Sequence, residues 1–190
     1  MKILRVAGDL YPAFVGGIAI HAHEMSKMQA SSGNEVTVYT SIWGDEPLEE
    51  VRDNYRIVRF KGITICRNPI ALRLFYRLFR ERHKYDVIHA HSHLYSSTVF
   101  CTLMRMVGSS PLVVTNHGLI SSIAPMWLQK IYIPTVARWV YNTADKIICY
   151  TETERDQLID LGICPEKIAV IHNGVDTDHF APLTNVTPKK

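Results

Sequence analysis

Two adjacent glycines, Gly16 and Gly17, separate an apolar N-terminal segment from a segment of helical period. Backbone N–H groups are unpaired where a helix begins, and the helix dipole places partial positive charge there. Glycines at such a point let a phosphate reach the main chain without meeting a Cβ atom. The pair therefore predicts a diphosphate site, although a tight turn is the alternative. The Gly-x-Gly-x-x-Gly fingerprint and the P-loop motif are both absent from the sequence, which disfavours a dehydrogenase or a P-loop ATPase.

Three histidines, His89, His91 and His93, alternate with other residues. Side chains two residues apart share one face of a strand, so the three imidazoles face one side if the strand continues as far as His93. Imidazole is a common zinc ligand, and a metal hydrolase is therefore one hypothesis, although no further carboxylate or thiolate ligand is evident nearby. The alternative is that these histidines bond the backbone or line a polar cleft.

A further histidine, His117, follows the apolar segment from Leu112 to Asn116. Ligands of open α/β sheets bind outside the carboxyl ends of the strands, and His117 follows such an end. It can donate a hydrogen bond to a sugar hydroxyl or stabilise charge; otherwise it is a turn residue without a ligand. Because Gly16, Gly17, His91 and His117 follow three separate strands, we expect them at one edge of the sheet.

The elements that must hold these residues alternate between short β-rich segments and longer helical ones. Several strands are apolar throughout, which is typical of parallel strands covered by helices on both faces. The pattern predicts an α/β fold, a Rossmann-like three-layer α/β/α sandwich with a mainly parallel sheet of about seven strands. The predicted strands are residues 3–7, 35–40, 56–60, 87–91, 112–116, 146–150 and 168–171.

Two helices have clear sequence signals. Thr151 and Glu154 form a Thr-x-x-Glu capping box, and Gly162 is the expected end of the helix that follows. Another helix spans residues 18–30 and begins at the glycine pair. The face of this helix that we expect to pack on the sheet consists of Ile18, Ala22, Met25 and Met28.

Residues 68–84 read as a basic amphipathic helix whose arginines include Arg73, Arg77 and Arg80. A helix of this kind can lie on an anionic leaflet, which predicts peripheral contact with the inner face of a membrane. The alternative is a helix packed on the sheet, with its arginines solvated or bound to an acidic partner domain.

Length and composition describe one globular domain, because the chain has 190 residues of which 47% are hydrophobic and 21% are charged. The net charge of +3 is too small to predict nucleic-acid binding. The four cysteines are far apart and have no CxxC spacing, so we expect reduced thiols and a cytoplasmic location. We also expect neither a secretory leader nor a membrane-spanning segment.

Five motifs together resemble one protein family: "GGIAIHAHEM", "DVIHAHS", "VVTNHG", "ADKIICYTETERDQL" and "IAVIHNGVDTDHF". In this order and spacing they are similar to the N-terminal, acceptor-side domain of the retaining glycosyltransferases of family four, which have the GT-B fold. The resemblance covers Met1 to about Phe180. It implies two Rossmann-like domains, a nucleotide-sugar donor in the cleft between them, and transfer with retention at the anomeric carbon without a metal cofactor.

The resemblance also implies roles for single residues on the donor side. By motif match, Gly16 and Gly17 approach the donor diphosphate, and His117 is the catalytic residue that contacts the transferred sugar near its reacting carbon. Backbone amides and basic side chains then replace the metal ion that other sugar transferases use at the diphosphate.

On the acceptor side, the resemblance implies that Asp9, Tyr11 and His91 line the site of a sugar or lipid acceptor. Asn116 stands where relatives often have a second histidine, and no role is assigned to it.

The resemblance divides the chain into an N-terminal domain over residues 1–177 and a linker over residues 178–190. The Glu-x7-Glu motif of the donor-binding domain is absent from the sequence, so we expect that domain as a partner, in cis or in trans. Preorganised electrostatics need both walls of the cleft, and we therefore expect negligible transfer by this chain alone. The alternative function is a non-catalytic binding module that pairs with a separate donor-binding chain.

Overall fold

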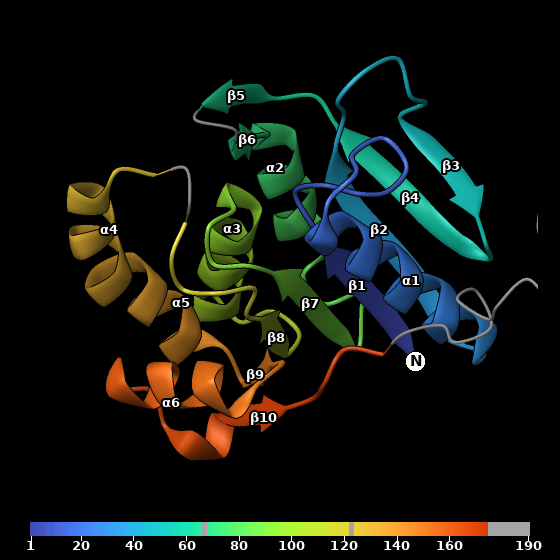
Figure 1. Cartoon of the computed structure of the whole chain (residues 1–190). Coiled ribbons are helices and arrows are strands. Elements are labelled where there is room, and N and C mark those ends of the chain that lie inside the picture. Colours follow the sequence, from blue (N-terminus) through green and yellow to red (C-terminus); the bar gives the residue numbers. More distant parts are fainter. Residues whose placement is uncertain (66–67, 122–123, 175–190) are drawn as a thin grey trace, which may run out of the picture.

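The computed structural model of the chain (Figure 1) describes residues 1–65, 68–121 and 124–174. Its centre is an eight-stranded sheet in the order β10-β9-β8-β7-β1-β2-β4-β3, in which only the pair of β3 with β4 is antiparallel. The strands are β1 (Lys2–Val6), β2 (Glu35–Ser41), β3 (Glu49–Arg52), β4 (Tyr55–Phe60), β7 (Val87–His91), β8 (Leu112–Thr115), β9 (Lys146–Cys149) and β10 (Ile168–Val170). The α/β class, the mainly parallel Rossmann-like sheet and all seven predicted strands are confirmed.

Three further strands were not predicted. β3 is a polar edge strand that pairs with β4 alone, and its Glu49 and Val51 are exposed. A two-stranded hairpin of β5 (Ile63–Ile65) with β6 (Asn68–Ile70) stands apart from the main sheet. Such short or exposed strands lack the apolar run that identifies a central strand.

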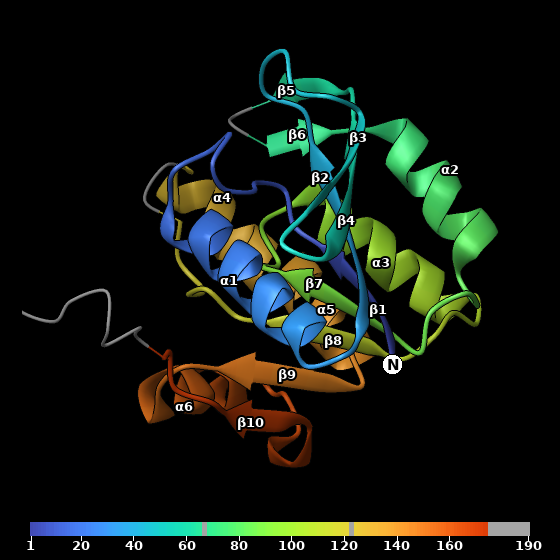
Figure 2. The same ribbon diagram turned by 90° about the vertical axis from the view of Figure 1, so that its right-hand side faces the viewer.

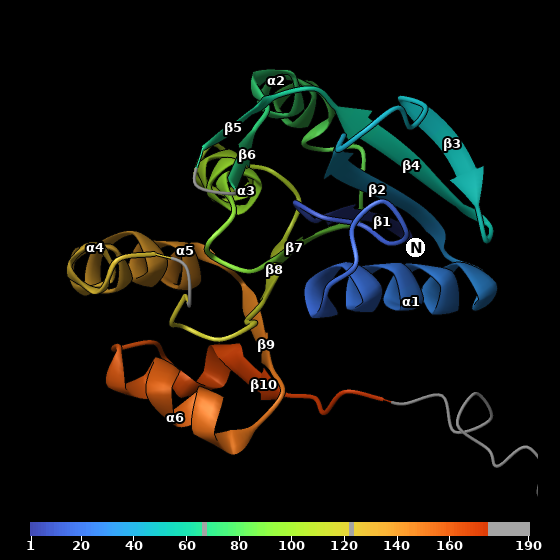
Figure 3. The same cartoon turned by 45° about the horizontal axis from the view of Figure 1, so that its top comes forward.

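Helices cover both faces of the sheet. Figure 3 shows α1 (Gly17–Ser31) on one side, with α2 (Leu72–Glu81) and α3 (Ser96–Met106) on the other. α6 (Glu152–Asp160) packs with β9 and β10 at one end of the molecule, followed by a 3₁₀ turn over Pro165–Lys167 (Figure 2). The larger apolar core lies on the α2 and α3 side and includes Val6, Ile88 and Tyr141, and a smaller one lies beneath α1.

The face of α1 that packs on the sheet differs from the prediction. Of the four residues expected there only Ala22 is buried, while Met28 is 68% exposed. Arg5 of β1 lies beneath the helix and donates a hydrogen bond to Ser26, so this face must offer polar groups as well as small ones. The buried residues of α1 are Ala19, Ala22, His23 and Ser26.

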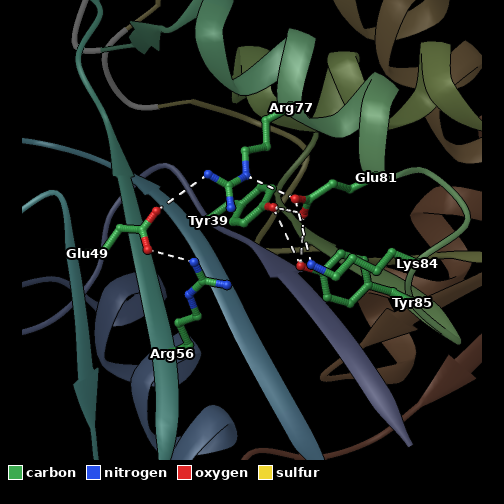
Figure 4. A network of polar contacts seen from close by, with 7 residues as sticks. All are labelled: Tyr39, Glu49, Arg56, Arg77, Glu81, Lys84 and Tyr85. Atoms are coloured by element: carbon green, nitrogen blue, oxygen red, sulfur yellow. Dashed lines mark hydrogen bonds and ion pairs between the residues drawn. The ribbon is translucent and has the colours of Figure 1, made fainter.

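The basic segment forms a shorter helix than predicted, because residues 68–70 belong to the hairpin strand β6 and α2 begins at Leu72. Leu74 and Leu78 are buried against the sheet. Arg77 of α2 donates to Glu81 at 3.2 Å and to Glu49 of β3 at 3.4 Å. These contacts belong to the polar network of Figure 4, whose other members are Tyr39, Arg56, Lys84 and Tyr85.

The aromatic stretch before β9 forms three consecutive helical segments: α4 (Met126–Tyr132), a π-helical turn (Ile133–Ala137) and α5 (Arg138–Thr143). Pro134 lacks a backbone donor, which is consistent with the wider turn at this point. Val140 and Tyr141 of α5 are buried as core, whereas Met126 and Trp127 of α4 are more than half exposed.

Strand order places a switch point beside β1. The chain proceeds from β1 toward β2 and β4 on one side, and β7, β8, β9 and β10 follow on the other. The loops that leave the carboxyl ends of β1 and β7 therefore run in opposite directions. Open α/β sheets bind ligands in the crevice at this position.

Candidate functional site

The residues predicted to follow strand ends do meet at the switch point. His91 ends β7, and His117 follows β8 by two residues, with its Nε2 atom 3.1 Å from Nδ1 of His91. Parallel pairing of β7 with β8 sets His91 opposite Thr115, which brings the two strand ends level. The loop from β1 reaches α1 at Gly16, so three separate strand ends contribute to one edge.

The glycine pair lies at the N-terminus of α1. Gly16 is the N-cap with φ −171° and ψ 159°, an extended conformation that any residue can adopt, and Gly17 begins the helix. A Cβ atom added to Gly17 would have no heavy atom within 4 Å among the described residues. No side chain of the described chain caps this helix. Neither backbone strain nor crowding therefore explains Gly17, and the first N–H groups of α1 have no acceptor within the helix.

An open cavity of about 350 Å³ lies beside the helix N-terminus. Small-molecule sites in proteins begin at about this volume. Sequence reasoning identified only Gly17 and His117 in its wall. His21 and Tyr150 also line the cavity but were not predicted. The sequence signals that could have identified them are the position of His21 one helical turn after Gly17 and the position of Tyr150 directly after β9. The lining residues are Gly17, Ile18, His21, His117, Tyr150, Glu154 and Asn173.

His21 connects the helix to the two strand ends. Its ring centroid lies 5.6 Å from those of His91 and His117, and 5.3 Å from that of Tyr150. Its Nε2 atom is buried and has no hydrogen-bond partner within the described part of the chain. A buried polar atom without a partner is costly, which is consistent with a ligand that supplies the partner.

Burial keeps these histidines neutral. Burial, together with the nearby His21, lowers the pKa of His117 to about 3. Burial, His89 and Arg5 hold the pKa of His91 well below its usual value. Neutral imidazole carries one N–H donor and one acceptor nitrogen. At neutral pH the cluster therefore offers directional hydrogen bonds instead of positive charge.

The helix start predicted at Thr151 is confirmed, but the Glu154 carboxylate bonds the residue before the N-cap instead of Thr151 itself. Thr151 is the N-cap, and its hydroxyl accepts from the backbone N–H of Glu154 at 3.2 Å. The carboxylate of Glu154 accepts from the backbone N–H of Tyr150 at 2.8 Å. Gly162 follows the helix with φ +84°, in the left-handed region that favours glycine. The cap fixes Tyr150 and Glu154 at the wall of the cavity.

Asp9 and Tyr11, which the sequence places on the acceptor side, lie in the loop after β1. The Asp9 carboxylate is buried and accepts a hydrogen bond from the Tyr95 hydroxyl, and burial raises its pKa despite that bond. The Tyr11 side chain is 40% exposed and its ring lies 5.4 Å from that of His23. None of the described contacts joins Asp9, Tyr11 and His91 to one another.

The strand does not continue as far as His93, so the three alternating histidines do not all face one side. β7 ends at His91, and Ser92 has φ +61°, which turns the chain out of the strand. His89 and His91 stack at 4.6 Å on the α1 side. The Nδ1 atom of His93 lies 2.8 Å from the hydroxyl of Tyr141, in the core on the opposite side. Within the described chain, no His, Cys, Asp or Glu groups are placed to hold a metal ion.

The basic residues of α2 have unequal surroundings. Arg77 is held by Glu49 and Glu81, whereas Arg73 and Arg80 are exposed. Next to these two arginines, the helix exposes Leu72, Tyr76 and Phe79. α2 therefore combines a packed face with an exposed face that is both apolar and basic.

Cys101, Cys149 and Cys164 are free thiols, as expected, and Cys66 lies outside the described residues. The expected boundary between residues 177 and 178 also lies outside them. No helix in the described ranges has the length and hydropathy needed to span a bilayer.

The family model of Glycosyltransferase Family 4 matches residues 15–179. A curated relative, the D-inositol 3-phosphate glycosyltransferase of Kineococcus radiotolerans, is 28% identical over 188 residues, which cover 88% of this chain and 42% of the relative. The chain thus spans about half the length of the curated relatives it matches.

Two solved structures share the fold. Sucrose-phosphate synthase from Thermosynechococcus elongatus superposes with a TM-score of 0.69 at 17% identity, over 93% of this chain and 49% of the other. The HepE protein of Anabaena, solved in complex with UDP and glucose, has a TM-score of 0.68 at 20% identity over 94% of this chain and 46% of the other. Both matches cover roughly half of the larger protein.

Proposed function

The chain belongs to glycosyltransferase family 4, and on that premise we propose that it forms the acceptor-side half of a retaining glycosyltransferase. The reaction moves a sugar from a nucleoside-diphosphate sugar to a sugar or lipid acceptor. One observation carries the proposal: the open helix N-terminus at Gly17 and the imidazole of His117 line the same cavity at the switch point of the sheet.

The donor diphosphate binds at the N-terminus of α1. The extended Gly16 and the uncrowded Gly17 leave the first backbone N–H groups of the helix accessible. These groups and the helix dipole favour an anion and stabilise the negative charge that develops on the leaving diphosphate. This role needs no metal ion. It also explains why position 17 is a glycine, since neither the φ angle nor the packing at Gly17 requires one.

His117 contacts the transferred sugar. Its imidazole is neutral, so it meets sugar oxygens through hydrogen bonds of fixed direction. His21 and Tyr150 complete this part of the wall, and the unpaired Nε2 atom of His21 offers one more polar group to a ligand. Held in this way, the anomeric carbon lies between the diphosphate and the acceptor.

The other wall of the cleft belongs to a second Rossmann-like domain, in cis or in trans. The cavity is open on one side, and the chain matches about half of each relative. HepE, whose matched half has this fold, is solved with UDP and glucose, which supports a nucleotide-sugar ligand here. On this arrangement residues 1–177 are the domain and residues 178–190 lead toward the donor-binding partner.

The acceptor binds on the His91 side of the site, near Asp9 and Tyr11. A lipid acceptor requires the protein to reach a membrane surface, and the exposed face of α2 offers Leu72 and Tyr76 beside Arg73 and Arg80. Basic and apolar side chains together bind anionic leaflets. The protein then works in the cytoplasm, on the inner face of the membrane. Arg77, held by two glutamates, stabilises α2 instead.

The test is a transfer assay on the protein isolated from its source cells, so that any natural partner domain is included. Labelled nucleotide sugars serve as donors, with sugar and lipid acceptors. We expect transfer with retained anomeric configuration, a loss of about a hundredfold in His117→Ala, and negligible transfer by the purified 190-residue chain. No transfer from any nucleotide sugar would overturn the proposal, as would full activity in His117→Ala.

A further inference from the structure

Arg5 lies in the middle of β1 and is completely buried. Its side chain projects toward α1, on the face of the sheet that also carries His89 and His91. Arginine is almost never fully buried unless its charge is paired. None of the ion pairs found among the described residues involves Arg5, so its surroundings need another explanation.

Neutral acceptors surround the guanidinium. Nη1 donates to the hydroxyl of Ser26 at 2.6 Å, and Nη2 donates to Oε1 of Gln29 at 2.8 Å. Nε donates to Nε2 of His91 at 3.1 Å, and Nη2 lies 3.4 Å from Nδ1 of His89. α1 and β7 therefore jointly hold one buried cation that touches the histidine cluster.

These contacts fix where each hydrogen lies, because a guanidinium has only donors. Nε2 of His91 must accept from Arg5, and a neutral imidazole then carries its hydrogen on Nδ1. That Nδ1–H points at Nε2 of His117, 3.1 Å away, which must accept in turn. His117 is left with its single hydrogen on Nδ1.

We propose that Arg5 is a positioning residue that acts through His91 to hold His117 as the neutral Nδ1–H tautomer. His117 then enters the ligand cavity as a hydrogen-bond donor and not as a proton acceptor. The tautomer is a property of the chain by itself, whereas its use on an oxygen of a nucleotide sugar rests on the proposed function.

The surroundings of Nδ1 leave this donor available. Among the described residues, Nδ1 contacts the Tyr150 hydroxyl at 3.5 Å, and the same hydroxyl lies 3.4 Å from Nε2; both distances are too long for a strong hydrogen bond. Its donor can therefore serve a hydroxyl or phosphate oxygen of a ligand in the cavity that His117 lines.

The contact of His89 with Arg5 fixes the tautomer of His89 in the same way. Its Nδ1 faces the Arg5 donor, so its hydrogen must lie on Nε2, which is 2.7 Å from the hydroxyl of Thr115. Arg5 thus imposes opposite tautomers on His89 and His91, two neighbours on the same strand. Free histidine side chains in water would not take opposite tautomers. Opposite tautomers in His89 and His91 therefore identify the effect of the buried arginine.

The experiment is ¹⁵N NMR of the imidazole nitrogens in the 190-residue chain at neutral pH, with His89, His91 and His117 assigned from single substitutions. We expect a protonated Nδ1 in His91 and His117 and a protonated Nε2 in His89. In Arg5→Met, which keeps the apolar stem but removes every donor, we expect His91 and His117 to lose the Nδ1–H form. A protonated Nε2 of His117 in the unsubstituted chain would overturn the proposal.

Arg59→Met is the matched control, because Arg59 is also a buried arginine of a strand but bonds Glu50 and Pro47 instead of histidines. The tautomers must be unchanged in it. If Arg5→Met does not fold, His91→Leu tests the same link, and persistence of a pure Nδ1–H form of His117 there would contradict the relay. These spectra are recorded without a ligand, so they test the tautomers alone. The proposed function is tested separately by adding UDP, and its failure would appear as an unaltered His117 resonance.

Discussion

The Nδ1 atom of His91 lies 3.1 Å from Nε2 of His117, so the ends of two adjacent parallel strands are joined by a direct contact between side chains. One residue is predicted for the acceptor side and the other for the transferred sugar. The contact places both at the switch point of the sheet, next to the N-terminus of α1. It also means that a change at one histidine alters the hydrogen bonding of the other.

Replacement of Gly17 separates its structural role from its binding role. Gly17 has no positive φ and its Cβ position is empty, so we expect Gly17→Ala to leave stability unchanged or to raise it by about 0.5 kcal/mol. The added methyl group lies where we place the diphosphate, and we expect affinity for a nucleoside diphosphate to fall by about tenfold, or about 1.4 kcal/mol. Urea unfolding and calorimetric titration measure the two effects.

Gly33→Ala is the matched control. Gly33 has φ +85° in the turn after α1, where an L-residue is strained, so we expect a loss of about 1 kcal/mol of stability and no change in affinity. If the Gly17→Ala variant and the unsubstituted chain bind a nucleoside diphosphate with equal affinity, the diphosphate does not bind at the helix N-terminus.

Stability should fall as the solution becomes acidic, because burial lowers the pKa of His93 to about 4 and the pKa of His117 to about 3. The unfolded chain binds protons at these histidines near pH 6.5, whereas the folded chain does not. Stability is therefore complete above pH 6.5 and is lost as pH falls toward the folded-state values. At pH 5 each such histidine costs about 2 kcal/mol.

Urea unfolding between pH 7.5 and pH 5 checks this expectation. His93→Gln removes one of the titrating groups, and its loss of stability over the same interval should be smaller by about 2 kcal/mol. A pH dependence of equal size in both proteins would show that His93 is not buried in its neutral form.

The exposed face of α2 makes a prediction about membrane binding. Arg73 and Arg80 are exposed and free to approach an anionic leaflet. Each basic residue near such a surface contributes about 1 kcal/mol, so the double substitution of both to Gln should weaken binding to phosphatidylglycerol vesicles by roughly thirtyfold. Co-sedimentation with vesicles measures this. Undiminished vesicle binding by the double variant would show that α2 does not contact the membrane.

Arg77→Gln distinguishes surface charge from internal stabilisation on the same helix. Arg77 bonds Glu49 and Glu81, and its guanidinium lies 5.9 Å from the centre of the Tyr39 ring. We expect its loss to lower stability by about 1 kcal/mol. Vesicle binding should fall less in this variant than in the double substitution, although both change arginine to glutamine.

Much of the fold was predictable, because central parallel strands are buried on both faces and so appear as continuous apolar runs. All seven such strands are present, and α1 begins at the glycine pair as expected. β3 was missed because Glu-Glu-Val-Arg is paired on one side only and has no apolar run. The bounds of β7 were predicted, but the turn that sends His93 to the other side of the sheet was not, because it depends on the left-handed backbone of Ser92, which no sequence pattern indicates.

The candidate site was predictable where residues follow strand ends, since parallel strands bring these ends to one edge. His21 and Tyr150 were not predicted, although His21 lies one helical turn after Gly17 and Tyr150 directly follows the end of β9. Arg5 had no sequence signal at all, because a charged residue within a short apolar strand usually lies at an exposed position. The same residue explains why the buried face of α1 is polar.

The central claim is that the glycine pair and His117 bind one ligand, a nucleotide sugar, in the cavity between α1 and the strand ends. Titration of UDP, GDP and their glucose conjugates into the ¹⁵N-labelled chain, followed by NMR, tests it most directly. We predict concentration-dependent shifts at the backbone amides of Gly17 and Ile18 and at the His117 imidazole, with weak affinity in the millimolar range. Shifts confined to other surfaces, or none with any of these ligands up to their solubility, would contradict the claim.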